Sequence, residues 1–163
     1  MDPSLLPTGL PKLRPLRVLI VEDDLDTAAS MALLLGLDGY TVDTARDGPT
    51  SLELARAGTP DVVLLDIGLP KMDGYALAEE LSRLHEPPII IAISGYEKAS
   101  DRRGSAHGGI TFYFLKPVRP DLLLRVLKTL QEQRDRAPQP AGIAPMLSSA
   151  GAAQMRLPSQ GSG

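Results

Sequence analysis

Charged and hydroxyl side chains follow the apolar runs of this sequence directly. Glu22 and Asp23 follow RVLIV, Asp66 follows VVLL, Ser94 follows IIIAI, and Lys116 follows TFYFL. A carboxylate at the end of a buried strand needs a partner or a purpose, because burying an unpaired charge is costly. Carboxylates that lie close together repel each other unless a cation joins them, and Mg²⁺ prefers such oxygen ligands. An acidic group with a lysine and a serine beside it can take a phosphoryl group, with an aspartate as nucleophile.

The elements that must position these side chains alternate along the chain. Apolar patterns predict strands at 17–21, 40–45, 62–65, 89–93 and 111–115, and helices at 26–37, 47–57, 75–84, 96–107 and 120–134. The helix at 96–107 is expected to be the least stable, because its only apolar residues from 97 onward are two alanines. Strands that alternate with helices predict an α/β fold, with a parallel sheet covered on both faces. In such sheets a site forms outside the carboxyl ends of the strands, so we expect the charged side chains to meet there.

In their order and on these strands, Glu22-Asp23, Asp66, Ser94 and Lys116-Pro117 resemble the receiver domain of two-component response regulators. The resemblance covers roughly residues 17–132. The segments VLIVEDD and LLDIGLPKMDG look particularly like receivers found with hybrid histidine kinases. The resemblance implies a flavodoxin-like, doubly wound five-stranded parallel sheet in the order 2-1-3-4-5.

The resemblance also implies a metal site with Mg²⁺ as the cofactor. Asp66 would be the phospho-acceptor and a metal ligand. Asp23 would bind Mg²⁺ directly, Glu22 would act through a water molecule, and Gly68 would offer its backbone carbonyl.

Further residues match the family's phosphoryl contacts and its switch. Ser94 would hydrogen-bond the phosphoryl group and take part in the switch, and Lys116 would pair with the group. Tyr113 would be the switch aromatic. The Lys116-Pro117 peptide bond would be cis.

Composition sets the domain organisation and excludes several classes of function. The chain has 163 residues, a net charge of -3 and no cysteine, so disulfides and thiolate metal sites are excluded. Neither sign of charge dominates, so we expect no binding to nucleic acid or to a membrane surface. Residues 1–16 are expected to form an irregular arm, 17–135 the receiver domain and 136–163 a disordered tail. The amino terminus contains prolines where a signal peptide needs an apolar core, so a cytoplasmic location is expected.

As a receiver, the chain would take its phosphoryl group from a sensor or hybrid histidine kinase, or from a histidine phosphotransfer protein. It would then signal by changing shape, through the fourth helix, the fifth strand and the last helix. Because no output domain follows in the sequence, we expect a single-domain receiver rather than an enzyme.

Other classes of protein agree less well with the pattern. A phosphohydrolase of the haloacid dehalogenase type needs a D-x-D pair that starts at its nucleophile, whereas Asp66 is followed by Ile67-Gly68. A pseudo-receiver, a binding module without phosphotransfer, would be expected to lack one of the five motif residues. None is missing here: the sequence has Glu22, Asp23, Asp66, Ser94 and Lys116. Dinucleotide binding is not supported, because no G-x-G-x-x-G follows a strand.

Overall fold

The computed structural model of this protein describes residues 14–95 and 108–137. The helix predicted at 96–107 lies outside these ranges, as do most of the predicted arm and nearly all of the predicted tail. The chain divides into two compact units, Met1–Gln131 and Glu132–Gly163. No helix within the described ranges is both long and apolar enough to cross a membrane.

The first unit contains a parallel sheet of five strands in the order β2-β1-β3-β4-β5. The strands are β1 (Arg17–Val21), β2 (Thr41–Ala45), β3 (Val62–Asp66), β4 (Ile89–Ser94) and β5 (Ile110–Leu115). This arrangement confirms the predicted fold class and strand order. The strand order reverses between β1 and β3. Because these two strands are parallel neighbours, their carboxyl ends lie side by side.

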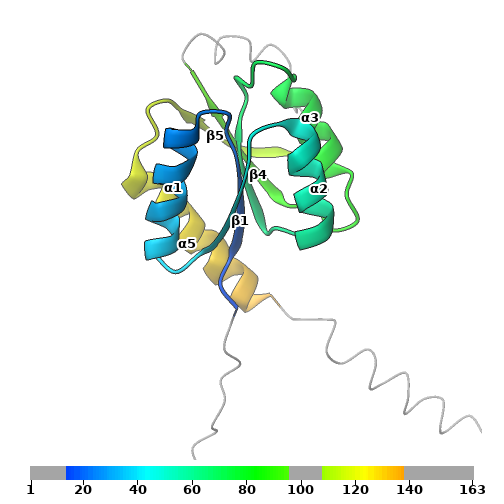
Figure 1. Cartoon of the computed structure of the whole chain (residues 1–163). Helices are drawn as coiled ribbons and strands as arrows, with labels where there is room; N and C mark the ends of the chain where they lie inside the picture. Colours follow the sequence, from blue (N-terminus) through cyan, green and yellow to red (C-terminus); the bar gives the residue numbers. More distant parts are fainter. Residues whose placement is uncertain (1–13, 96–107, 138–163) are drawn as a thin grey trace, which may run out of the picture. The chain divides into compact units, whose positions relative to one another are not determined.

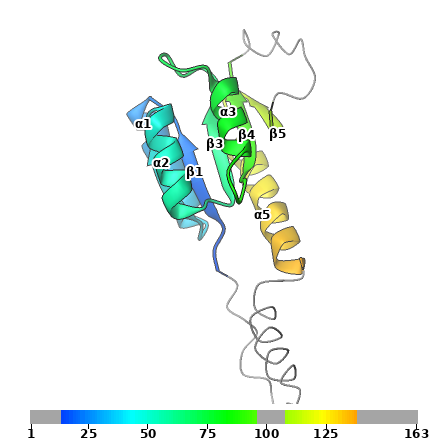
Figure 2. The same ribbon diagram turned by 90° about the vertical axis from the view of Figure 1, so that its right-hand side faces the viewer.

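Helices cover both faces of the sheet, as predicted. They are α1 (Leu25–Leu37), α2 (Gly48–Gly58), α3 (Gly74–Ser82) and α5 (Pro120–Arg136). Figure 1 shows α1 and the first part of α5 on one face, and α2 and α3 on the other. The turned view in Figure 2 shows α2 and α3 on the near side of the sheet.

Each face of the sheet packs its own apolar core. Leu52 of α2 and Leu77 of α3 lie in one cluster, and Leu35 of α1 and Leu127 of α5 lie in the other. All five residues of β3 are buried, which explains the unbroken apolar run that precedes Asp66. Strand β2 is at the edge of the sheet, and only its last residue, Ala45, is fully buried. The strand predicted at 40–45 is therefore present but buries little, because an edge strand has less core to face.

Aspartates begin three of the helices that lead away from the site. The carboxylates of Asp24, Asp47 and Asp73 accept backbone N–H groups in the first turns of α1, α2 and α3. After α1 the chain turns at Gly39, whose φ of +96° is a conformation that favours glycine. These caps define where each loop ends, and so how much chain is available to build the site.

Helix α1 is apolar on nearly every side but buries few of its residues. Ala28 and Leu35 are buried, whereas Leu25, Leu33 and Leu37 are 59%, 65% and 80% exposed. On α5, Leu123 and Leu127 are buried, whereas Leu122 is exposed.

Candidate functional site

Three carboxylates meet at the carboxyl edge of the sheet. Glu22 and Asp23 follow β1 and Asp66 ends β3, and one oxygen of each lies within 4.8 Å of the others. Adjacent parallel strands bring these residues together, since Val21 is paired with Leu65. Glu22 and Asp66 are buried and Asp23 is half-buried. Three oxygen donors this close, with one side open to water, suit the coordination that Mg²⁺ prefers.

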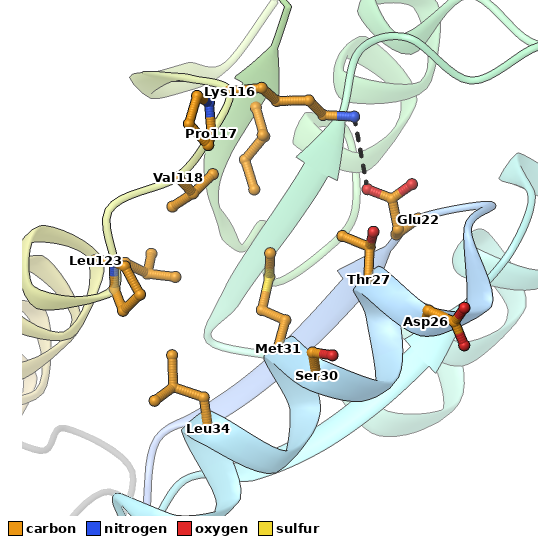
Figure 3. Close-up of a pocket in the computed structure, with 12 residues that line it drawn as sticks. Glu22, Asp26, Thr27, Ser30, Met31, Leu34, Lys116, Pro117, Val118 and Leu123 are labelled. Atoms are coloured by element: carbon orange, nitrogen blue, oxygen red, sulfur yellow. Dashed lines mark ion pairs between the residues drawn. The ribbon is translucent and has the colours of Figure 1, made fainter.

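A lysine from the far side of the sheet joins the acidic cluster. Lys116 follows β5, and its Nζ lies 2.9 Å from Oδ2 of Asp66 and 3.8 Å from Oε2 of Glu22. Figure 3 shows the Lys116 side chain extending toward the Glu22 carboxylate. The Lys116-Pro117 peptide bond is cis, as expected. The ammonium thus neutralises part of a concentrated negative charge.

Burial and charge perturb the titration of this cluster. Burial raises the pKa of Glu22 from 4.5 to about 7, and the neighbouring charge of Asp66 adds to the effect. Burial by itself lowers the pKa of Lys116, but the hydrogen bond to Asp66 and the nearby carboxylates outweigh it, so that its pKa lies above the usual value. The lysine is therefore held in its charged form, while Glu22 carries the electrostatic cost of the crowded site.

The second oxygen of Asp66 is also engaged. The backbone N–H of Gly68 donates to Oδ1 of Asp66 over 2.8 Å. This bond folds the chain back at the end of β3 and leaves the exposed Gly68 beside the cluster. Both oxygens of Asp66 therefore have a donor, one from Gly68 and one from Lys116.

Ser94 lies on the same edge, and the hydrogen bond that its hydroxyl donates goes to a backbone carbonyl rather than to an acid. It is buried at the end of β4, and its hydroxyl donates to the carbonyl of Gly95 over 3.1 Å. Its carbonyl accepts the backbone N–H of Lys116 over 2.9 Å, which ties β4 to the lysine. Tyr113 lies on β5, is paired with Ala92 of β4 and is 37% exposed.

The structure separates the roles within Glu22-Asp23-Asp24, which sequence patterns alone could not. Asp24 is exposed, and its carboxylate accepts the N–H of Thr27 over 2.8 Å at the start of α1. This hydrogen bond lowers the pKa of Asp24. Asp24 is therefore a helix cap, and only its two predecessors join Asp66.

Two hollows border the site, and neither was predicted. A groove of about 830 Å³ lies between α1 and the start of α5, with Met31, Leu34 and Leu123 among its apolar walls. A cleft of about 900 Å³ begins at Asp23 and runs between the β2–α2 and β3–α3 loops to Met72. The residues that define this cleft in the sequence are Gly48, at the start of α2, and Met72, in the β3–α3 loop. Neither indicates a cleft by its residue type, because the two come together only in the folded chain.

Comparison with known proteins identifies the family. The model of the "Response regulator receiver domain" family matches residues 18–128, which include the acids, Ser94 and Lys116. The chain belongs to this family. Receiver domains are signalling modules of two-component systems and are typically not enzymes.

The curated relatives are longer proteins. Response regulator MprA of Mycolicibacterium vanbaalenii is 30% identical over 116 residues, which cover 71% of this chain and 50% of that protein. Transcriptional regulatory protein PrrA of Mycobacterium tuberculosis is 34% identical over 118 residues, which cover 72% of this chain and 51% of that protein. The chain thus spans about half the length of these relatives.

Solved receiver structures match the fold over nearly their full length. The CheY-like receiver domain protein of Methanospirillum hungatei JF-1 is 31% identical with a TM-score of 0.67, covering 76% of this chain and 99% of that one. The receiver domain of the sensor histidine kinase PA1611 of Pseudomonas aeruginosa PAO1 is 27% identical with a TM-score of 0.65, covering 72% and 98%. That structure has a magnesium ion coordinated in its active-site cleft.

Proposed function

We propose that this receiver accepts a phosphoryl group on the carboxylate of Asp66. The observation that carries the proposal is the contact of Lys116 Nζ with Asp66 Oδ2 at 2.9 Å, within a cluster of three acids at the carboxyl edge of the sheet. A rigid strand end holds the nucleophile, and positioning of this kind is a main source of rate in phosphoryl transfer.

The donor is proposed to be a phosphohistidine. An oxygen of Asp66 attacks the phosphorus atom, the P–N bond to the imidazole breaks, and the imidazole leaves with the bonding electron pair. The product is an acyl phosphate on Asp66. Family membership supports this donor, because receiver domains take phosphoryl groups from histidine kinases.

Glu22, Asp23 and Asp66 fit a bound Mg²⁺, because they offer hard oxygen ligands from two adjacent strands. In our proposal Asp23 and Asp66 are direct ligands, Glu22 acts through water, and the Gly68 carbonyl completes the protein's share. When bound, Mg²⁺ would neutralise charge on the phosphoryl oxygens. The magnesium ion in the PA1611 receiver supports this assignment.

Lys116 and Ser94 are proposed to bind the transferred group. Lys116 already lies against the acceptor oxygen, so a small movement would bring its ammonium to a phosphoryl oxygen. The Ser94 hydroxyl would exchange its bond to the Gly95 carbonyl for one to the phosphoryl group. That exchange would couple the site to β5, since the Ser94 carbonyl accepts the Lys116 N–H.

We propose that the signal leaves through β5 and α5, together with the segment 96–107, and that Tyr113 is the switch aromatic. Exposed apolar side chains support this surface: Phe112, Tyr113 and Leu115 on β5 and Leu122 on α5 are 36–43% exposed. A downstream protein would be the partner, as in the sequence prediction, and conformational exchange of Tyr113 would bias its binding.

Labelling with acetyl phosphate tests the acceptor. With Mg²⁺ present, the protein should gain one base-labile phosphoryl group by intact mass spectrometry, and Asp66→Asn should gain none. Asp43→Asn is the matched control, because Asp43 is an exposed aspartate in the middle of β2. Equal labelling of Asp66→Asn and the parent would refute the acceptor, and a parent that takes no label from any donor would favour the pseudo-receiver.

A further inference from the structure

Met72 lies directly on Gly48, across the cleft that begins at Asp23. A Cβ atom at position 48 would lie 1.7 Å from Sδ of Met72 and 2.8 Å from its Cε. The thioether therefore occupies the space that any side chain at position 48 would need. Gly48 is buried at the start of α2, and Met72 is half-buried against the core on that face of the sheet.

This contact joins the two loops that flank the acidic cluster. Gly48 follows the end of β2, where the carbonyl of Ala45 accepts the N–H of Glu22 over 2.9 Å. Met72 belongs to the β3–α3 loop, which begins beside Asp66 and contains Gly68. The β2–α2 loop thus begins beside a hydrogen bond to the backbone of Glu22, and the β3–α3 loop continues from the proposed acceptor, Asp66.

The base of the β3–α3 loop is closed by a second close approach. A Cβ atom at Gly74 would lie 2.7 Å from Cα of Ile67, so the two ends of the loop touch. The bond from the Gly68 N–H to Asp66 lies next to this base. With its base closed, the loop has its outer arm held against α2 by Met72.

We infer that Met72 is a positioning residue for the metal site, acting through its contact with Gly48. The contact holds the β3–α3 loop at the distance from the β1–α1 turn at which the Gly68 backbone and the Asp23 carboxylate face one ion. This inference rests on the proposed function for the identity of the ion and for its ligands, the Gly68 carbonyl among them. It makes no claim about the phosphodonor or about phosphoryl transfer.

Gly48→Ala is a suitable perturbation, because the atoms that must move are the far end of a flexible side chain. Displacing the thioether costs little packing but removes Met72 from its place. Residues that orient metal ligands typically change metal affinity by 10- to 100-fold when altered, so we expect Gly48→Ala to weaken Mg²⁺ binding roughly ten-fold. Gly36→Ala is the matched control, because a Cβ atom there meets nothing within 4 Å.

A double-mutant cycle tests the contact itself. In the 163-residue protein, Mg²⁺ affinity is measured by following backbone amide signals by NMR, and thermal stability is measured in EDTA. Once Met72→Ala has removed the thioether, adding Gly48→Ala should change Mg²⁺ affinity less than about two-fold. The difference from the roughly ten-fold effect of Gly48→Ala alone would show that the two residues act through their contact. The Gly68 amide signal should shift in Gly48→Ala and not in Gly36→Ala.

Several results would overturn the inference. One is that Gly48→Ala binds Mg²⁺ as tightly as the parent does. Another is that Gly48→Ala weakens Mg²⁺ binding as much in the Met72→Ala background as it does in the parent. A lower melting temperature in EDTA with unchanged Mg²⁺ affinity would show a purely structural role, and a parent that binds no Mg²⁺ would remove the site that Met72 is said to position. Failure of the proposed function is seen separately, as labelling of Asp66→Asn by acetyl phosphate.

Discussion

Replacing Glu22 by glutamine should stabilise the metal-free protein, although it removes a residue from the proposed site. Glu22 is 4% exposed and lies among two other carboxylates. The glutamine amide keeps the size of the side chain and an oxygen that can accept the N–H of Asp24, which bonds Glu22 over 3.2 Å. The substitution therefore removes the charge and little else.

The magnitude follows from the pKa of Glu22, which burial raises from 4.5 to about 7. The difference corresponds to about 3 kcal/mol, since one pH unit is worth about 1.4 kcal/mol. Below pH 4.5 Glu22 is protonated in both the folded and the unfolded chain, so it adds no pH dependence. Between 4.5 and about 7 the folded state holds a proton that the unfolded state has lost, so stability falls as pH rises.

The assay is urea denaturation in EDTA across this pH range, monitored by circular dichroism. The stability gained by Glu22→Gln should be near zero below pH 4.5 and should approach about 3 kcal/mol above pH 7. Glu53→Gln is the control, because Glu53 is exposed on α2, and its effect should stay within about 0.5 kcal/mol at every pH. With saturating Mg²⁺ the advantage of Glu22→Gln should shrink, because a cation offsets the repulsion that the substitution relieves.

A gain that is the same at every pH would refute this reasoning, because it would arise from packing rather than from charge. A loss of stability above pH 7 would also refute it, because it would mean that the Glu22 carboxylate makes net favourable contacts in the metal-free site.

Three further predictions concern the stability effects of substitutions outside the acidic cluster, each measured by urea denaturation in EDTA. Asp61→Ala should cost about 1–3 kcal/mol, because its carboxylate accepts the backbone N–H of Arg17 over 2.8 Å where β1 begins, and a negligible cost would mean that water replaces it. Gly74→Ala should cost about 1–3 kcal/mol through the clash with the backbone of Ile67, and parent-like stability would show that the loop relaxes freely. Thr59→Gly should stabilise by up to about 1 kcal/mol, because Thr59 has a left-handed φ of 42°, and a loss would show that the threonine side chain is worth more than the strain.

Much of the fold was predictable because local patterns agreed with the tertiary arrangement. The run before Asp66 is unbroken because β3 is covered on both faces, and a parallel sheet puts all carboxyl ends on one edge. These two facts are enough to predict from the sequence that Glu22, Asp66 and Lys116 lie close together. The strand predicted at 40–45 is likewise present as β2, although its edge position leaves most of its residues unburied.

Only the tertiary structure decided how the neighbouring polar residues divide their work. Asp23 and Asp24 are adjacent acids, but one faces Asp66 and the other caps α1, because the chain turns between them. The Ser94 hydroxyl bonds the Gly95 carbonyl rather than an acid. Hydrogen bonds of this kind depend on where a loop leaves the sheet, which residue type and spacing do not specify.

The contact of Met72 with Gly48 is the clearest case of what sequence could not supply. The residues are 24 positions apart, in loops that follow different strands, and neither has a titratable group. Their contact follows from the order β2-β1-β3, which places the two loops on either side of the β1 acids. The sequence by itself determined which groups could bind a metal and a phosphoryl group, because residue chemistry and strand ends are local properties. The packing of loops across the sheet edge decided how closely those groups are held, because close packing is a property of the whole fold.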